Sequence, residues 1–106
     1  CDFQYLYFAE DGYVICCKHC HYYQIAFGNT LLNITAKDFL LLREKLKCTC
    51  DNGGFHLSKN TKNIVVETPS QNLFLLFTRR EATQFHHMIE EADIEAKAQS
   101  LIDLFY

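Results

Sequence analysis

The residues with the clearest chemical potential form the run Cys17-Lys18-His19-Cys20-His21. Two cysteines separated by two residues, on a turn between two strands, can direct two thiolates at one metal ion, as zinc knuckles do. Zinc takes four ligands at the corners of a tetrahedron, so two more ligands are needed. The spacing therefore predicts half of a structural zinc site.

The expected strand pairing supplies the other half. If the chain turns at Asp11-Gly12, antiparallel pairing places Cys20 opposite Phe3 and brings Cys1 to the same end of the sheet. We therefore expect a zinc site with the ligands Cys1, Cys17, Cys20 and His21. Three further residues remain as alternative ligands, namely His19, Cys48 and Cys50.

The same cysteines have two other interpretations. Cysteine is often a small buried hydrophobe, so Cys17 and Cys20 can be inert thiols, and we expect Cys16 in the core because it faces the other side of its strand. A thiol-based redox protein or sensor using Cys17 and Cys20 is the third interpretation. Its C-x-x-C lies between two expected strands, whereas a helix N-terminus is the usual place for an activated pair.

Composition excludes several classes of protein. The chain has 106 residues, 49% of them hydrophobic, which is typical of one domain spanning 1–106. Its 10 Lys and Arg against 13 Asp and Glu give a net charge of −3, so no basic excess indicates a nucleic-acid binder. No apolar run approaches the ~20 residues of a membrane span. Six cysteines, partly clustered with histidines, favour a reducing, cytoplasmic setting.

No catalytic signature is found in the chain, which lacks a phosphate-binding loop, a G-x-S-x-G motif and a dinucleotide fingerprint. We therefore expect a small binding or interaction module rather than an enzyme. The aromatic residues of the first strands can form a stacking platform for single-stranded nucleic acid, but no Lys or Arg accompanies them. A packed aromatic core is the expectation.

Hydrophobic periodicity predicts an α+β fold in the order ββββ-α-βββ-α. Short turns between neighbouring strands favour an antiparallel sheet or open barrel, and the layout is similar to that of pleckstrin-homology-like domains. The expected strands cover 3–9, 13–17, 22–27, 31–34, 55–57, 64–67 and 73–77, and the expected helices cover 36–47 and 79–105.

The second helix is the longest expected element. The sequence Thr78-Arg79-Arg80-Glu81 fits a capping box at its start. A helix over 79–105 extends roughly 40 Å, which exceeds the width of a domain of this size. We therefore expect that it kinks near Asp93, or that its end projects and docks on a protein partner. Homodimerisation through this helix is one form of such docking.

The stretch from Gly12 to Leu46, GYVICCKHCHYYQIAFGNTLLNITAKDFLLLREKL, resembles a bacterial family of small uncharacterised proteins. The shared features are an aromatic hairpin, the C-x-x-C, a strand ending in A-F-G-N and a capped helix. The resemblance implies that the C-x-x-C is a family feature and that the setting is cytoplasmic. It implies no activity and no functional residue.

Overall fold

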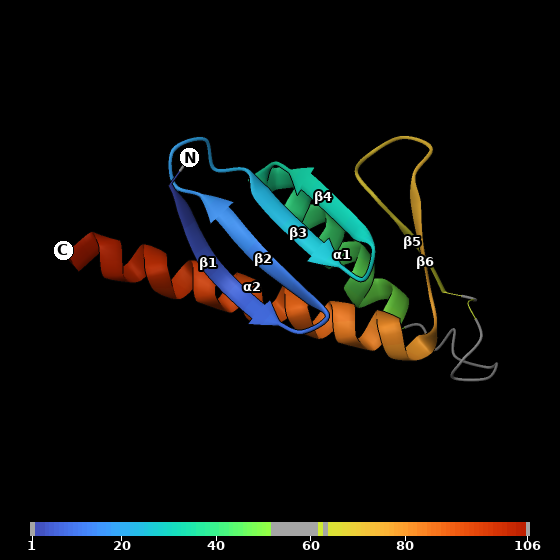
Figure 1. Cartoon of the computed structure of the whole chain (residues 1–106). Coiled ribbons are helices and arrows are strands. Elements are labelled where there is room, and N and C mark those ends of the chain that lie inside the picture. Colours follow the sequence, from blue (N-terminus) through green and yellow to red (C-terminus); the bar gives the residue numbers. More distant parts are fainter. Residues whose placement is uncertain (1, 52–61, 63, 106) are drawn as a thin grey trace. The chain divides into compact units, whose positions relative to one another are not determined.

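The computed structural model describes residues 2–51, 62 and 64–105 (Figure 1). They form two compact units, which are described separately. Unit 1 combines Cys1–Ala36 with Met88–Tyr106, and unit 2 is Lys37–His87. The element order confirms the expected α+β class.

Unit 1 contains an open, four-stranded antiparallel sheet in the order β1-β2-β3-β4. Alternating buried and exposed residues along the strands give the sheet one core-facing side. The strands contain no charged residue, as their sequences show. Their bounds are Phe3–Ala9 for β1, Gly12–Cys17 for β2, Tyr23–Phe27 for β3 and Thr30–Ile34 for β4.

The first hairpin turns one residue earlier than the sequence suggests. The turn residues are Glu10 and Asp11, and Gly12 already belongs to β2, where it pairs with Ala9. Gly12 is needed as a strand residue because a Cβ there would lie 2.3 Å from the carbonyl oxygen of Ala26. The close approach of two backbones therefore explains this glycine better than turn geometry does.

The expected register of the first hairpin is consequently wrong. Cys17, and not Cys20, is paired with Phe3. The earlier turn accounts for part of the shift, and an irregularity between Tyr5 and Tyr7 in β1 accounts for the remainder. As a result β2 ends at Cys17, and Cys20 lies in the turn that follows.

Helix α2 extends from Arg79 to Phe105 and is not interrupted at Asp93, where the sequence suggested a kink as one of two possibilities. Its part in unit 1 buries Met88, Ile89 and Ala92. Asp93 is also buried, and its carboxylate forms an ion pair with Lys97 one turn later, at 2.8 Å. A buried carboxylate needs such a partner because an unpaired buried charge is costly.

Unit 2 is built from most of α1, Ala36–Asp51, together with the hairpin of β5, Ile64–Glu67, and β6, Phe74–Phe77, and the start of α2. Helix α1 continues four residues beyond the expected end at 47 because no glycine or proline occurs before Gly53. The Thr49 hydroxyl donates to the Lys45 carbonyl within this extension, at 2.8 Å. The expected strand at 55–57 lies outside the described residues.

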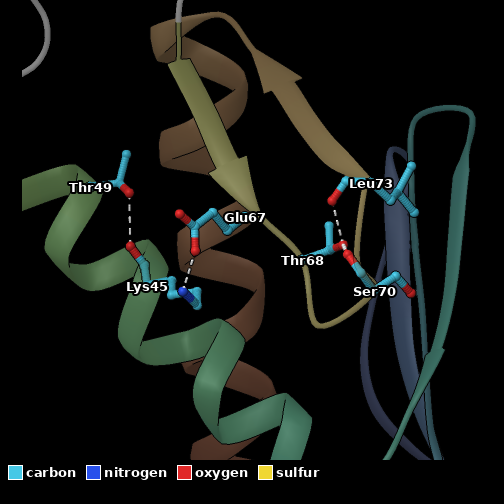
Figure 2. Close-up of polar contacts among 6 residues, drawn as sticks. All are labelled: Lys45, Thr49, Glu67, Thr68, Ser70 and Leu73. Atoms are coloured by element: carbon cyan, nitrogen blue, oxygen red, sulfur yellow. Dashed lines mark hydrogen bonds and ion pairs between the residues drawn. The ribbon is translucent and has the colours of Figure 1, made fainter.

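Polar contacts order the segment between β5 and β6 (Figure 2). The Thr68 hydroxyl lies 3.2 Å from the Ser70 carbonyl oxygen and 2.6 Å from that of Leu73. Lys45 of α1 forms an ion pair with Glu67 at the end of β5, and its hydrogen bond and charge lower the pKa of the Glu67 carboxyl. Both side chains of that pair are exposed, so it adds little stability.

The predicted capping box of α2 is confirmed. The Glu81 N–H donates to the Thr78 hydroxyl at 3.1 Å, and the Thr78 N–H donates to the Glu81 carboxylate at 2.9 Å. Lys62 also donates to that carboxylate, and this bond is the main cause that lowers the pKa of Glu81. Within the described ranges, no helix has the length and apolar character of a membrane span.

Candidate functional site

The cysteine turn, defined here as Cys17–His21, connects β2 to β3 in unit 1. Two backbone hydrogen bonds of 2.9 Å close it, from the Cys17 N–H to the Tyr22 carbonyl and from the His21 N–H to the Cys17 carbonyl. His21 has a φ of 62°, in the left-handed region that is uncommon for a residue other than glycine. The turn is therefore a defined structure at the end of the sheet.

A backbone amide of the turn points at the first cysteine sulfur. The Cys20 N–H donates to Cys17 Sγ at 3.4 Å. Cys17 is buried, with 2% of its surface exposed, whereas Cys20 is exposed. This N–H holds the backbone of Cys20 against the Cys17 sulfur within the turn.

The cysteines of the turn differ in their bonding. Cys17 is disulfide-bonded, whereas Cys16, Cys20 and Cys48 are free thiols. The C-x-x-C pair is thus not a disulfide.

The expected zinc ligands are only partly brought together. Cys17, Cys20 and His21 lie in one turn, as does the exposed His19, but Cys1 is outside the described residues. Among the residues that the structure describes, no three His, Cys, Asp or Glu side chains are placed to hold a metal ion. Of the alternatives on α1, Cys48 is exposed and belongs to unit 2. The side chain of Cys50 lies outside the part of the chain that the structure describes.

A cleft of about 400 Å³ lies beside the cysteine turn within unit 1. The turn supplies Lys18 and His21, and the C-terminal part of α2 supplies Asp103. Tyr23 at the start of β3 also lines it, and burial, then the nearby Cys16 and Asp93, raise the pKa of its hydroxyl. The cleft thus combines cationic, anionic and hydroxyl groups.

Cys16 lines this cleft and is half-buried, so the expectation of a fully buried core thiol is wrong. Burial raises its pKa, and the nearby Cys20 raises it further. Because only the thiolate reacts with iodoacetamide, we expect Cys16 in the native protein to be alkylated at least about tenfold more slowly than Cys48 at pH 8. Peptide mapping after timed alkylation measures both rates. Equal rates in the folded protein would contradict this placement of Cys16.

Comparison with known proteins gives one finding about the whole chain. A family described as a family of unknown function, DUF6686, matches residues 1–105. The chain belongs to this family. The expected membership of a family of uncharacterised proteins is thereby confirmed, whereas its bacterial origin and the motifs between Gly12 and Leu46 stay predictions. No curated protein and no solved structure matches the chain.

The sheet of this DUF6686 chain also exposes aromatic residues that were expected in the core. Tyr5 and Phe8 are 68% and 73% exposed. Their rings meet edge to face with centroids 6.3 Å apart, and Phe8 stacks on Tyr13 at 6.0 Å. Phe3 and Tyr22 are exposed as well. The expectation of a packed aromatic core is therefore wrong for these four residues, because the alternation of the sequence does not show which face is covered.

A second exposed apolar surface of the DUF6686 chain lies on α2. The residues Ile94, Leu101 and Phe105 are 59%, 58% and 82% exposed, and Ala98 lies between them at helical spacing and is half-buried. We name these four residues the outer stripe. A large apolar side chain exposed in a group, rather than singly, is typical of an interaction surface. Sequence periodicity detects the helix here but not which of its apolar residues stay exposed.

Proposed function

We propose that the protein is a small, non-enzymatic interaction module whose cysteine turn holds a structural zinc ion. The proposed ligands are Cys1, Cys17, Cys20 and His21. The main support for the zinc site is the hydrogen bond from the Cys20 N–H to Cys17 Sγ. It lies within a turn that two backbone hydrogen bonds close. In metal sites, hydrogen bonds from neighbouring groups orient the atoms that bind the ion.

The sulfur chemistry of the turn also supports this assignment. Cys17, whose sulfur is in a disulfide, lies three residues from Cys20 in the same turn. After reduction, these sulfurs are free to ligate one ion, since zinc prefers thiolates and imidazole. A reducing, cytoplasmic setting keeps the thiols in that form.

The interaction half of the proposal depends on the exposed apolar residues of α2. The outer stripe belongs to the 27-residue helix α2, which buries Ile89 and Ala92 in unit 1 but exposes all of residues 101–105. The partner is another protein chain, either a different protein or a second copy bound through α2. A nucleic acid does not fit, because the strands of the sheet carry no charge and the chain is acidic overall.

The zinc content of protein purified under reducing conditions, without added metal, tests the first half of the proposal. We expect about one zinc per chain in the wild type and in Cys48→Ser, the matched control, since Cys48 is exposed and belongs to unit 2. In Cys20→Ser the affinity for zinc falls by about 100-fold or more, because one of four ligands is lost. Competition with a chromogenic chelator measures the zinc content and the zinc affinity of all three proteins.

Two outcomes would contradict the zinc site. One is a wild-type protein without metal whose thiols all titrate after reduction. The other is Cys20→Ser and Cys48→Ser proteins that hold zinc equally well.

A thiol-based redox role of Cys17 and Cys20 is the second candidate, and the disulfide at Cys17 favours it. In such a role the Cys20 thiolate attacks Cys17 Sγ, a Cys17–Cys20 disulfide forms, and the former partner sulfur leaves as a thiolate. Equilibration in glutathione buffers distinguishes the roles. A reduction potential near that of the cytosolic glutathione pool supports the redox role. A potential below about −300 mV is typical of a structural disulfide and would contradict the redox role.

A further inference from the structure

We propose that the cleft beside the cysteine turn is a binding site for a small zwitterionic peptide of about the size of a dipeptide. In this site Lys18 binds the carboxylate of the ligand and Asp103 binds its ammonium group. The inference goes beyond the proposed function, because it assigns a small ligand in addition to a protein partner and a zinc ion.

The cleft has the size of a small-molecule site and lies wholly within unit 1. Its volume of about 400 Å³ falls in the range of roughly 300–1,000 Å³ that is usual for ligand pockets. Its lining comes from β1, from the end of β2 with the cysteine turn, from the start of β3 and from the C-terminal part of α2. Strands and a helix therefore form most of the cleft, which favours a site that exists before the ligand binds.

Two opposite charges line this cleft without pairing with each other. Lys18 comes from the cysteine turn and Asp103 from α2, and both side chains are exposed. Within the described part of the chain neither forms an ion pair, so the Lys18 ammonium and the Asp103 carboxylate are more than 4.0 Å apart. His21 also lines the cleft, but Lys18 suffices for the carboxylate, so the site does not depend on whether His21 holds zinc.

This pair of charges selects a zwitterion. A simple anion entering the cleft meets the Asp103 carboxylate, and a simple cation meets the Lys18 ammonium, so each gains one attraction and one repulsion. A ligand that carries both charges gains two attractions. In a free amino acid the two charges sit on one carbon, whereas in a dipeptide a peptide group separates them. The separation of Lys18 and Asp103 therefore fits the longer ligand better.

The uncharged polar lining fits the peptide group of such a ligand. Gln4 of β1 and Gln99 of α2 both line the cleft, and each amide offers donors and an acceptor. The Gln99 amide nitrogen donates to the Glu95 carboxylate at 2.9 Å, which orients the side chain and leaves its carbonyl oxygen as an acceptor. A peptide group needs one acceptor for its N–H and one donor for its carbonyl oxygen, and these two side chains supply both kinds.

Equilibrium dialysis of the full chain against a mixed pool of dipeptides tests the site. We expect mass spectrometry to find one or more dipeptides retained by the protein, with a dissociation constant of about 1 mM or lower by calorimetry. Acetylation of the amino end of the retained dipeptide weakens its binding about tenfold or more, and so does amidation of its carboxyl end. Each change removes one charge-assisted hydrogen bond.

Variants that remove one charge assign the two ends of the ligand. In Asp103→Asn the free and the acetylated dipeptide bind within about threefold of each other, and in Lys18→Gln the same holds for the free and the amidated dipeptide. The controls Glu91→Gln and Lys47→Gln remove the same charges outside the cleft and keep both preferences, because water and salt screen distant charges. Circular dichroism checks that all four variants fold.

Three results would overturn the inference. These are a pool from which the protein retains no dipeptide, acetate that binds as tightly as the dipeptide, or capped and free dipeptides that bind the wild type equally. Zinc analysis of the same samples keeps the two proposals apart. A zinc-loaded protein that retains no dipeptide overturns the cleft site alone, whereas a zinc-free protein that binds the dipeptide overturns the zinc site alone.

Discussion

The variant Gly12→Ala is expected to lose about 3 kcal/mol or more of unfolding free energy. Its new methyl group would lie 2.3 Å from the Ala26 carbonyl oxygen and 3.1 Å from Met88 Sδ. The thioether is able to move, but the carbonyl belongs to the backbone of the neighbouring strand β3. Relief of the contact therefore requires β2 and β3 to separate at their pairing. Urea unfolding followed by circular dichroism measures the loss.

Gly28→Ala is the matched control, because it is the same substitution in the same unit. Gly28 has a φ of +58° and no atom within 4 Å of the added methyl group. Only the left-handed backbone is unfavourable there, at about 1 kcal/mol. Equal losses in the two variants would contradict the close approach of β2 and β3 at Gly12.

The variant Phe85→Ala is expected to lose about 3–5 kcal/mol of unfolding free energy through unit 2. Phe85 is 1% exposed, and its ring packs on Phe77 with centroids 5.2 Å apart. Removal of the ring leaves a cavity between the start of α2 and β6, in addition to the lost burial of apolar surface. Urea unfolding gives the free energy, and hydrogen exchange of β5 and β6 amides locates the loss in the hairpin.

Phe74→Ala controls for the removal of a phenyl ring. Phe74 lies in the same strand as Phe77 but is 57% exposed. Its loss is expected to stay within about 1 kcal/mol. If Phe74→Ala destabilises the protein as much as Phe85→Ala does, Phe85 is not a centre of the unit 2 core.

The strands and helices were predictable from the sequence because alternation and helical spacing are local signals. The strands at 3–9 and 64–67 and the helix at 79–105 match the structure within a residue. The capping box at Thr78 was predictable for the same reason, since its partners are three residues apart. Local patterns therefore sufficed wherever the interaction partners are close in sequence.

The cysteine positions depended on strand register, which local patterns do not determine. A turn placed one residue late and an irregularity between Tyr5 and Tyr7 together moved the partner of Phe3 from Cys20 to Cys17. The exposure of Phe8 and of the outer stripe could not be predicted from the sequence either. Apolar residues at regular spacing indicate a face but not what covers it.

X-ray absorption at the zinc edge, on protein purified under reducing conditions without added metal, tests the zinc site most directly. We predict a four-coordinate ion with a sulfur shell at about 2.3 Å and a nitrogen at about 2.0 Å, the distances of thiolate and imidazole ligands. Cys20→Ser should then lose one sulfur from that shell. A shell of oxygen and nitrogen alone, or no stoichiometric zinc, would contradict a zinc ion held by the cysteine turn.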